Sequence, residues 1–198
     1  MTTLHGVPRL FQLWACKQVH SIAGTNQRLH KQGDSRDPWC PSCLEEVETC
    51  AHFLMCDEED RVKCFQMSAD NLQSWLQSVG TSEILEEYIT EFVRSRNSKS
   101  FMECVAGSRD SQVIRLARSQ DKIGWRRFME GMISKEFCRI QETHRRLSNS
   151  YISGDKWAQS LMVKLLEMSH GQWNVGGVLA LERKEDLRWL SRNSRLWV

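Results

Sequence analysis

Four side chains able to bind a metal ion lie between residues 40 and 56. Cys40 and Cys43 form a C-x2-C pair, His52 follows after a spacer of eight residues, and Cys56 lies four positions beyond His52. A tight turn directs the sulfurs of a C-x2-C pair toward one point, and residues four apart share a helix face. These residues predict a tetrahedral Cys3His site for Zn2+. Because protein donors fill all four positions, the pattern is typical of structural rather than catalytic zinc.

The other cysteines leave two alternatives open. Cys50 lies two residues before His52, and it would serve as a ligand only if His52 or Cys56 were left out. Alternatively the cluster holds no metal, because free cysteine also packs well in a core. The spacer before His52 is shorter than in DNA-reading zinc fingers, so we do not expect one. The remaining cysteines are expected to be buried thiols in helices: Cys16, Cys64, Cys104 and Cys138.

The composition is that of a soluble globular protein. The 198 residues are 40% hydrophobic and 26% charged with a net charge of +2, which argues against wholesale disorder and a strongly basic nucleic-acid arm. No run approaches the roughly 18 apolar residues of a membrane span, so no membrane partner is expected. The N-terminus lacks the apolar core of a secretory signal. We therefore expect an intracellular protein, in the nucleus or cytoplasm, with reduced cysteines.

The elements that position these residues are predicted to be almost entirely helical. Gly80 is expected to end one helix, and a single long amphipathic helix is predicted from Trp125 to Leu147. Beyond a short hairpin near the cysteines, no strand is indicated. The fold class is therefore mainly α, a helical bundle with a small Cys3His zinc knuckle at about residues 28–65. Apolar residues recur at helical spacing over 10–17, 62–79, 84–93, 125–147 and 157–168.

The polar stretch 94–110 has the weakest pattern for regular structure. It suggests a division of the chain into two regions. Residues 1–96 would contain an N-terminal helix, the zinc knuckle and the helices that follow. Residues 110–198 would form a C-terminal helical region.

Charge is distributed unevenly along the chain. Residues 40–100 contain five basic and twelve acidic residues, and the acidic side chains Glu45, Glu46, Glu48 and those of 57–60 would repel a phosphate backbone lying across the knuckle. Any nucleic acid is therefore expected on the basic flanks, where it would bind with salt-dependent affinity. The alternative is an ordinary solvated helix face. The candidate contacts are Arg28, Lys31, Arg126, Arg127, Lys135 and Arg139.

The segment around the cysteines resembles a known family. The run Arg28-Leu-His30 followed by Gly33, the CPSC sequence at 40–43, the Glu48-Thr49 pair and HFLMC at 52–56 resemble the zinc-binding domain at the C-terminal end of reverse transcriptases from non-LTR retroelements. The resemblance covers about residues 8–65. It implies a fragment that lacks its polymerase and serves as a zinc-stabilised accessory module, binding RNA or DNA without catalysis.

A later stretch that includes Trp125 and Trp157 looks like the helical region that follows the knuckle in such reading frames. There the final helix is followed by Trp-x-x-Arg-Asn, but this chain has Trp173-Asn-Val-Gly-Gly177. We expect the residues beyond Trp173 to be altered or to derive from another frame, and nothing is carried over to them.

No catalytic activity is expected. Polymerases need paired carboxylates that hold metal ions, but the acidic run 57–60 follows the predicted ligand Cys56 directly and is better explained as the first turn of a helix. No small-molecule substrate is indicated. Besides nucleic-acid binding, two readings stay open: a protein-interaction or structural module with zinc stabilising its fold, and a retroelement relic without activity.

Overall fold

The fold is mainly α-helical, as predicted, with ten helices and no strand among the residues described. The computed structural model describes residues 6–148 and 152–193, with side chains described through residue 177. None of the described helices is long and apolar enough to cross a membrane. The helices are α1 (Arg9–Val19), α2 (Asn26–Gln32), α3 (His52–Met55), α4 (Glu59–Ser78), α5 (Glu83–Arg94), α6 (Phe101–Cys104), α7 (Ser111–Asp121), α8 (Trp125–Met129), α9 (Lys135–Ser148) and α10 (Gly154–Asn193).

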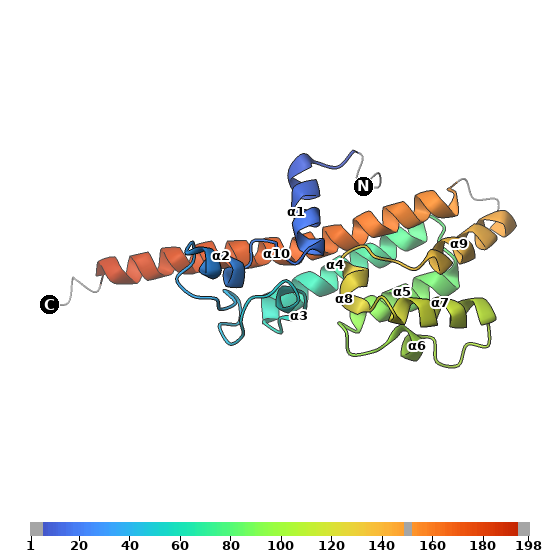
Figure 1. Cartoon of the computed structure of the whole chain (residues 1–198), viewed down its shortest axis with the longest axis horizontal. Coiled ribbons are helices and arrows are strands. Elements are labelled where there is room, and N and C mark those ends of the chain that lie inside the picture. The colour runs from blue at the N-terminus through green and yellow to red at the C-terminus, as the bar shows by residue number, and fades with distance from the viewer. Residues whose placement is uncertain (1–5, 149–151, 194–198) are drawn as a thin grey trace.

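Helix α10 is the axis of the molecule (Figure 1). Its 40 residues give a length of about 60 Å at 1.5 Å per residue. The helix packs against α4 and α9 along its N-terminal half and against α1, α3 and α8. Figure 1 shows α1 lying across α10, while α5 to α9 gather beside its N-terminal part. One long helix therefore contacts elements distributed over residues 9–148.

Gly80 ends helix α4, as predicted. Gly80 adopts a φ of +65°, and the N–H groups of Gly80 and Thr81 donate to the carbonyls of Gln77 and Leu76 at 3.1 Å. These two bonds form a Schellman motif that ends the helix. The predicted stripes at 62–79 and 84–93 accordingly lie on the separate helices α4 and α5.

The single helix predicted from Trp125 to Leu147 is wrong. The chain forms α8 and α9 instead, separated by a turn at Gly131 with a φ of +80°. A Cβ on Gly131 would lie 3.3 Å from the carbonyl oxygen of Met162 in α10, so the close approach of α10 also favours glycine here. The apolar period continues across the break, which explains why the sequence pattern does not show it.

A single core joins both sides of the segment 94–110. Phe101 in α6 lies within this segment, is fully buried, and contacts Phe92 and Phe137 edge-on at 4.9 and 5.5 Å between ring centroids. Such geometry is favoured between aromatic rings. The division into regions 1–96 and 110–198 stays a prediction.

Candidate metal centre

The Cys3His segment, residues 38–56, begins with a short hairpin-like loop. Trp39 and Val47 form an isolated antiparallel bridge, and the Cys40 N–H donates to the Glu46 carbonyl at 2.7 Å. Between them the N–H of Leu44 donates to the Cys40 carbonyl at 2.9 Å. This tight turn brings Cys40 and Cys43 to one side of the loop, as the C-x2-C spacing predicts.

The second half of the segment presents His52 and Cys56. Thr49 Oγ1 accepts a hydrogen bond from the His52 N–H at 3.0 Å, which satisfies one unpaired donor at the start of the four-residue helix α3. Cys56 follows directly after α3. One helical turn therefore places the imidazole and the third thiol, that of Cys56, on the same side.

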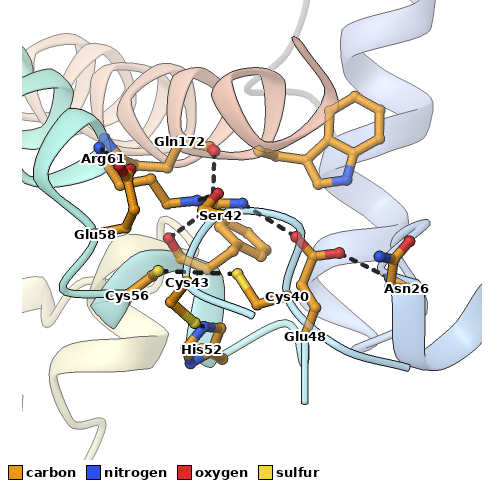
Figure 2. A network of polar contacts seen from close by, with 12 residues as sticks. Asn26, Cys40, Ser42, Cys43, Glu48, His52, Cys56, Glu58, Arg61 and Gln172 are labelled. Atoms are coloured by element: carbon orange, nitrogen blue, oxygen red, sulfur yellow. Dashed lines mark hydrogen bonds and ion pairs between the residues drawn. The ribbon is translucent and has the colours of Figure 1, made fainter. Parts of the chain in front are cut away.

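The four predicted ligands converge on one point (Figure 2). Their donor atoms all lie within 4.8 Å of one another, with 3.8 Å between the sulfurs of Cys40 and Cys56 and 3.5 Å between Cys43 Sγ and His52 Nε2. A tetrahedral zinc with ordinary bond lengths requires about 3.8 Å between two sulfurs and about 3.6 Å between sulfur and nitrogen. The described residues thus form a cluster that could bind a metal ion, and its cysteines are not joined in disulfides.

The alternative ligand Cys50 lies elsewhere. It is buried in the hydrophobic core, and the donor atoms that converge do not include its sulfur. Burial raises the pKa of the Cys50 thiol, which favours the neutral form of a core residue. Of the four cysteines predicted as buried thiols, all lie in helices, but only Cys104 is buried, while Cys16, Cys64 and Cys138 are half-buried.

Glu46 is a site residue that the sequence did not identify. Its carboxylate lies 2.9 Å from Nδ1 of His52, so Nδ1 donates to Glu46 and Nε2 faces the sulfurs. A carboxylate in this position fixes the tautomer and orientation of a metal-binding histidine. Spacing alone could not select Glu46 from its two glutamate neighbours, because the hairpin register decides which of them faces the ring.

The charges of the cluster suit a cation. Burial alone would raise the pKa of the Cys40 thiol, but hydrogen bonds from His52 and from backbone N–H groups bring it down to about 6. The hydrogen bond with Cys40 in turn raises the pKa of His52 to about 9. Burial raises the pKa of Cys56 to about 12. A metal ion would displace these protons, so its binding is expected to weaken as the pH falls.

A buried arginine joins the Cys3His segment to α4 and α10 (Figure 2). Arg61 has no exposed surface, and its Nη1 donates to the carbonyls of Phe53 and Gln172 at 3.2 and 3.1 Å. Its Nε donates to Ser42, within the CPSC turn. Its Nη2 forms an ion pair with Glu48 at 3.1 Å. One guanidinium therefore links three segments that are far apart in sequence.

Glu48 corrects the expectation that the whole acidic segment repels phosphate. Its side chain is 8% exposed and is paired with Arg61, and its second oxygen accepts the N–H of Asn26 at the start of α2 at 2.8 Å. Asn26 also donates to the carbonyl of Trp39. The Glu48 charge is thus neutralised inside the protein, and the Glu48-Thr49 pair serves to attach α2 and to begin α3.

The basic residues predicted on the C-terminal side do not share one helix face. Arg126 and Arg127 lie in α8, and both pair with the buried carboxylate of Glu130 at 3.2 and 2.8 Å. Arg139 lies in α9 and pairs with Glu136. These three guanidinium groups therefore have carboxylate partners within the protein.

The other three candidates are less constrained. Lys31 in α2 and Lys135 at the start of α9 are exposed, and Arg28 in α2 is half-buried. Within 6–148 and 152–177, none of the three makes an ion pair. Of the six predicted contacts, these keep their charge available to a ligand.

Comparison with known proteins identifies no relative. No protein-family model matches the chain. No curated protein and no solved structure matches it either. The resemblance to retroelement reverse transcriptases therefore depends on the sequence motifs alone.

Proposed function

We propose that the chain is a zinc-stabilised accessory module, derived from a retroelement reverse transcriptase, that binds nucleic acid without catalysing a reaction. The convergence of Cys40, Cys43, His52 and Cys56 is the observation that carries the zinc assignment. Three sulfurs and one imidazole suit zinc better than magnesium or calcium, which prefer oxygen donors. With four protein donors, no coordination position is left for a substrate.

Native mass spectrometry tests the metal assignment. The purified chain is expected to carry one zinc, and Cys56→Ser is expected to lose it. Cys50→Ser is the matched control, because Cys50 is also a buried thiol but lies outside the cluster, and this variant should keep the metal. Zinc retained by Cys56→Ser but lost from Cys50→Ser would refute the ligand set.

The proposed nucleic-acid surface is α2. Arg28 and Lys31 lie on this helix, which Asn26 ties to the Cys3His segment through Glu48 and the Trp39 carbonyl. Zinc would order the Cys3His segment, and this segment would in turn hold α2 and its two cations in place. Cations without internal carboxylate partners can bind backbone phosphates whatever the base sequence. The affinity should therefore depend on salt and vary little with sequence.

A binding measurement against salt tests this proposal. The zinc-loaded chain should bind a 30-nucleotide single-stranded RNA and a DNA duplex more weakly as salt rises from 50 to 200 mM. The double variant Arg28→Gln, Lys31→Gln should reduce the slope of log K against log salt for RNA by about 1.4, for two lost contacts. Arg115→Gln, which removes a cation paired with Glu136, is the control. No binding at 50 mM would favour the protein-interaction alternative or a relic.

The acidic run 57–60 supports a non-catalytic role. Glu58 accepts the N–H of Arg61 and begins α4. Asp57 pairs with Arg96 at 3.3 Å, and Glu59 pairs with Lys63 at 2.6 Å. These carboxylates begin a helix and form surface ion pairs.

A further inference from the structure

The outer side of the Cys3His segment has two adjoining grooves of about 440 and 600 Å³. Glu45, Glu46, Met55 and the predicted ligand His52 line both of them, Trp39 lines the larger, and the ligand Cys43 lines the smaller. Volumes of this size accommodate several side chains. We call hairpin groove the part of this surface that lies outside the metal ligands, formed by Trp39, Glu45, Glu46, Val47, Met55 and Glu58.

Large apolar side chains are exposed in and beside the hairpin groove. Trp39 is 45% exposed and Met55 is 36% exposed, and the neighbouring Leu44 is 61% exposed. Tryptophan and methionine are enriched where proteins contact one another. Their backbone positions are fixed by the Trp39–Val47 bridge and by α3, so little ordering cost would accompany binding.

The rim of the groove is acidic. Glu45 is exposed and makes no ion pair within the described parts of the chain, and Glu58 contributes a second carboxylate, which accepts the Arg61 N–H. Glu46 contacts His52 but keeps 72% of its side chain exposed. The groove therefore combines negative charge with an exposed indole ring, and a cation held over an indole face is further stabilised by the ring electrons.

We propose that the hairpin groove binds a lysine- and arginine-rich polypeptide segment that also carries apolar residues. The cations would contact Glu45, Glu46 and Glu58, and an apolar side chain would pack between Trp39 and Met55. Nucleic acid and anionic lipid both have the wrong charge for this surface. A small inorganic cation would leave the apolar part of the groove unused. This surface is distinct from the basic helix α2 and does not depend on nucleic-acid binding.

Peptide titration of the zinc-loaded chain tests this proposal. The probe is a 12-residue peptide of three Lys-Leu-Arg-Ala repeats, and its binding is followed by amide and indole NMR shifts. The expected result is saturable binding that shifts the Trp39 indole signal. A peptide with glutamate at the basic positions should not bind, and one with serine at the leucine positions should bind at least threefold more weakly.

Two charge reversals separate a specific site from general attraction. Glu45→Lys should weaken peptide binding about three- to tenfold, because a favourable contact becomes repulsive. Glu83→Lys reverses an exposed charge on α5 and should leave the affinity within twofold. Trp39→Ala should also weaken binding, and its zinc content would show that the segment still folds. Equal losses for both reversals, or shifts confined to other surfaces, would overturn the proposal.

Discussion

Gly176 provides a direct test of the network around Arg61. A Cβ on residue 176 would lie 2.0 Å from Arg61 Nη2 and 3.3 Å from Glu48 Oε1. The guanidinium would therefore have to leave the position in which it pairs with Glu48 and donates to the Gln172 carbonyl. Gly177 is the matched control, because it is the next residue of the same helix and a Cβ there meets nothing within 4 Å.

The expected effect of Gly176→Ala follows from two opposing contributions. Breaking a buried ion pair costs about 3–5 kcal/mol, because the remaining charge stays buried without a partner. Replacing glycine by alanine inside a helix gains about 1 kcal/mol. Gly176→Ala should therefore lower the free energy of unfolding by about 2–4 kcal/mol, and Gly177→Ala should raise it by up to about 1 kcal/mol.

Urea unfolding of the zinc-loaded proteins, followed by circular dichroism at 222 nm, measures these differences. In an Arg61→Ala background the cost of Gly176→Ala should disappear, since the contact that it disrupts is already gone. Gly176→Ala should also weaken zinc binding in a chelator competition, because Arg61 holds Ser42 and the Phe53 carbonyl beside the ligands. Equal stability of Gly176→Ala and Gly177→Ala would refute the reasoning.

Three further predictions concern individual contacts. Glu46→Gln should weaken zinc affinity about 10- to 100-fold by removing the carboxylate that orients His52, whereas Glu45→Gln should leave it unchanged in the same chelator competition. Trp157→Phe should lower the free energy of unfolding by about 1–3 kcal/mol, because Trp157 Nε1 donates to buried Thr81 Oγ1; urea unfolding measures this. Hydrogen bonds from Arg145 and the Gly154 N–H lower the pKa of Glu142 from 4.5 to about 2. The stabilisation that they provide is present above pH 4.5 and is lost as the pH falls toward 2, so the melting-temperature difference between wild type and Glu142→Gln should shrink over that range.

Local features explain why much of the fold could be predicted from the sequence. The apolar spacing that forms α4 and α5, and the glycine that separates them, depend only on residues close together in the sequence. The break after α8 also has a local part, because the N–H groups of Gly131 and Met132 donate to the carbonyls of Phe128 and Arg127 at 2.8 and 2.9 Å, but contacts with α10 add to it. Ser169 in α10 donates to the Met129 carbonyl at 2.8 Å, which satisfies a group at the end of α8. Nothing within 125–147 indicates this partner, because it lies 40 residues away.

The candidate site also has a part that could be predicted from the sequence and a part that could not. The four ligands follow from spacing within 17 residues, because a turn and one helical turn are enough to bring them together. Three glutamates of one short loop take different places instead. Glu46 contacts His52, Glu48 is buried against Arg61, and Glu45 faces outward. The sequence gives all three the same acidic character, and only the hairpin register and the packing of α4 distinguish them.

The network also changes how the chain near Trp173 is understood. The sequence departs there from the retroelement pattern, and its two glycines would ordinarily weaken a helix by about 1 kcal/mol each. Gly176 is required by the packing. Because it has no side chain, Arg61 can lie against α10 while it contacts Glu48.

An apolar pair of similar size could stabilise this junction as well as a buried ion pair does. It could not specify position to the same degree. The donors of Arg61 meet acceptors on the CPSC turn, on α3 and on α10 at once, and shifting α10 by one residue would move the Gln172 carbonyl about 1.5 Å along the axis and turn it about 100° around it. We infer that the guanidinium fixes the register of α10 against the Cys3His segment.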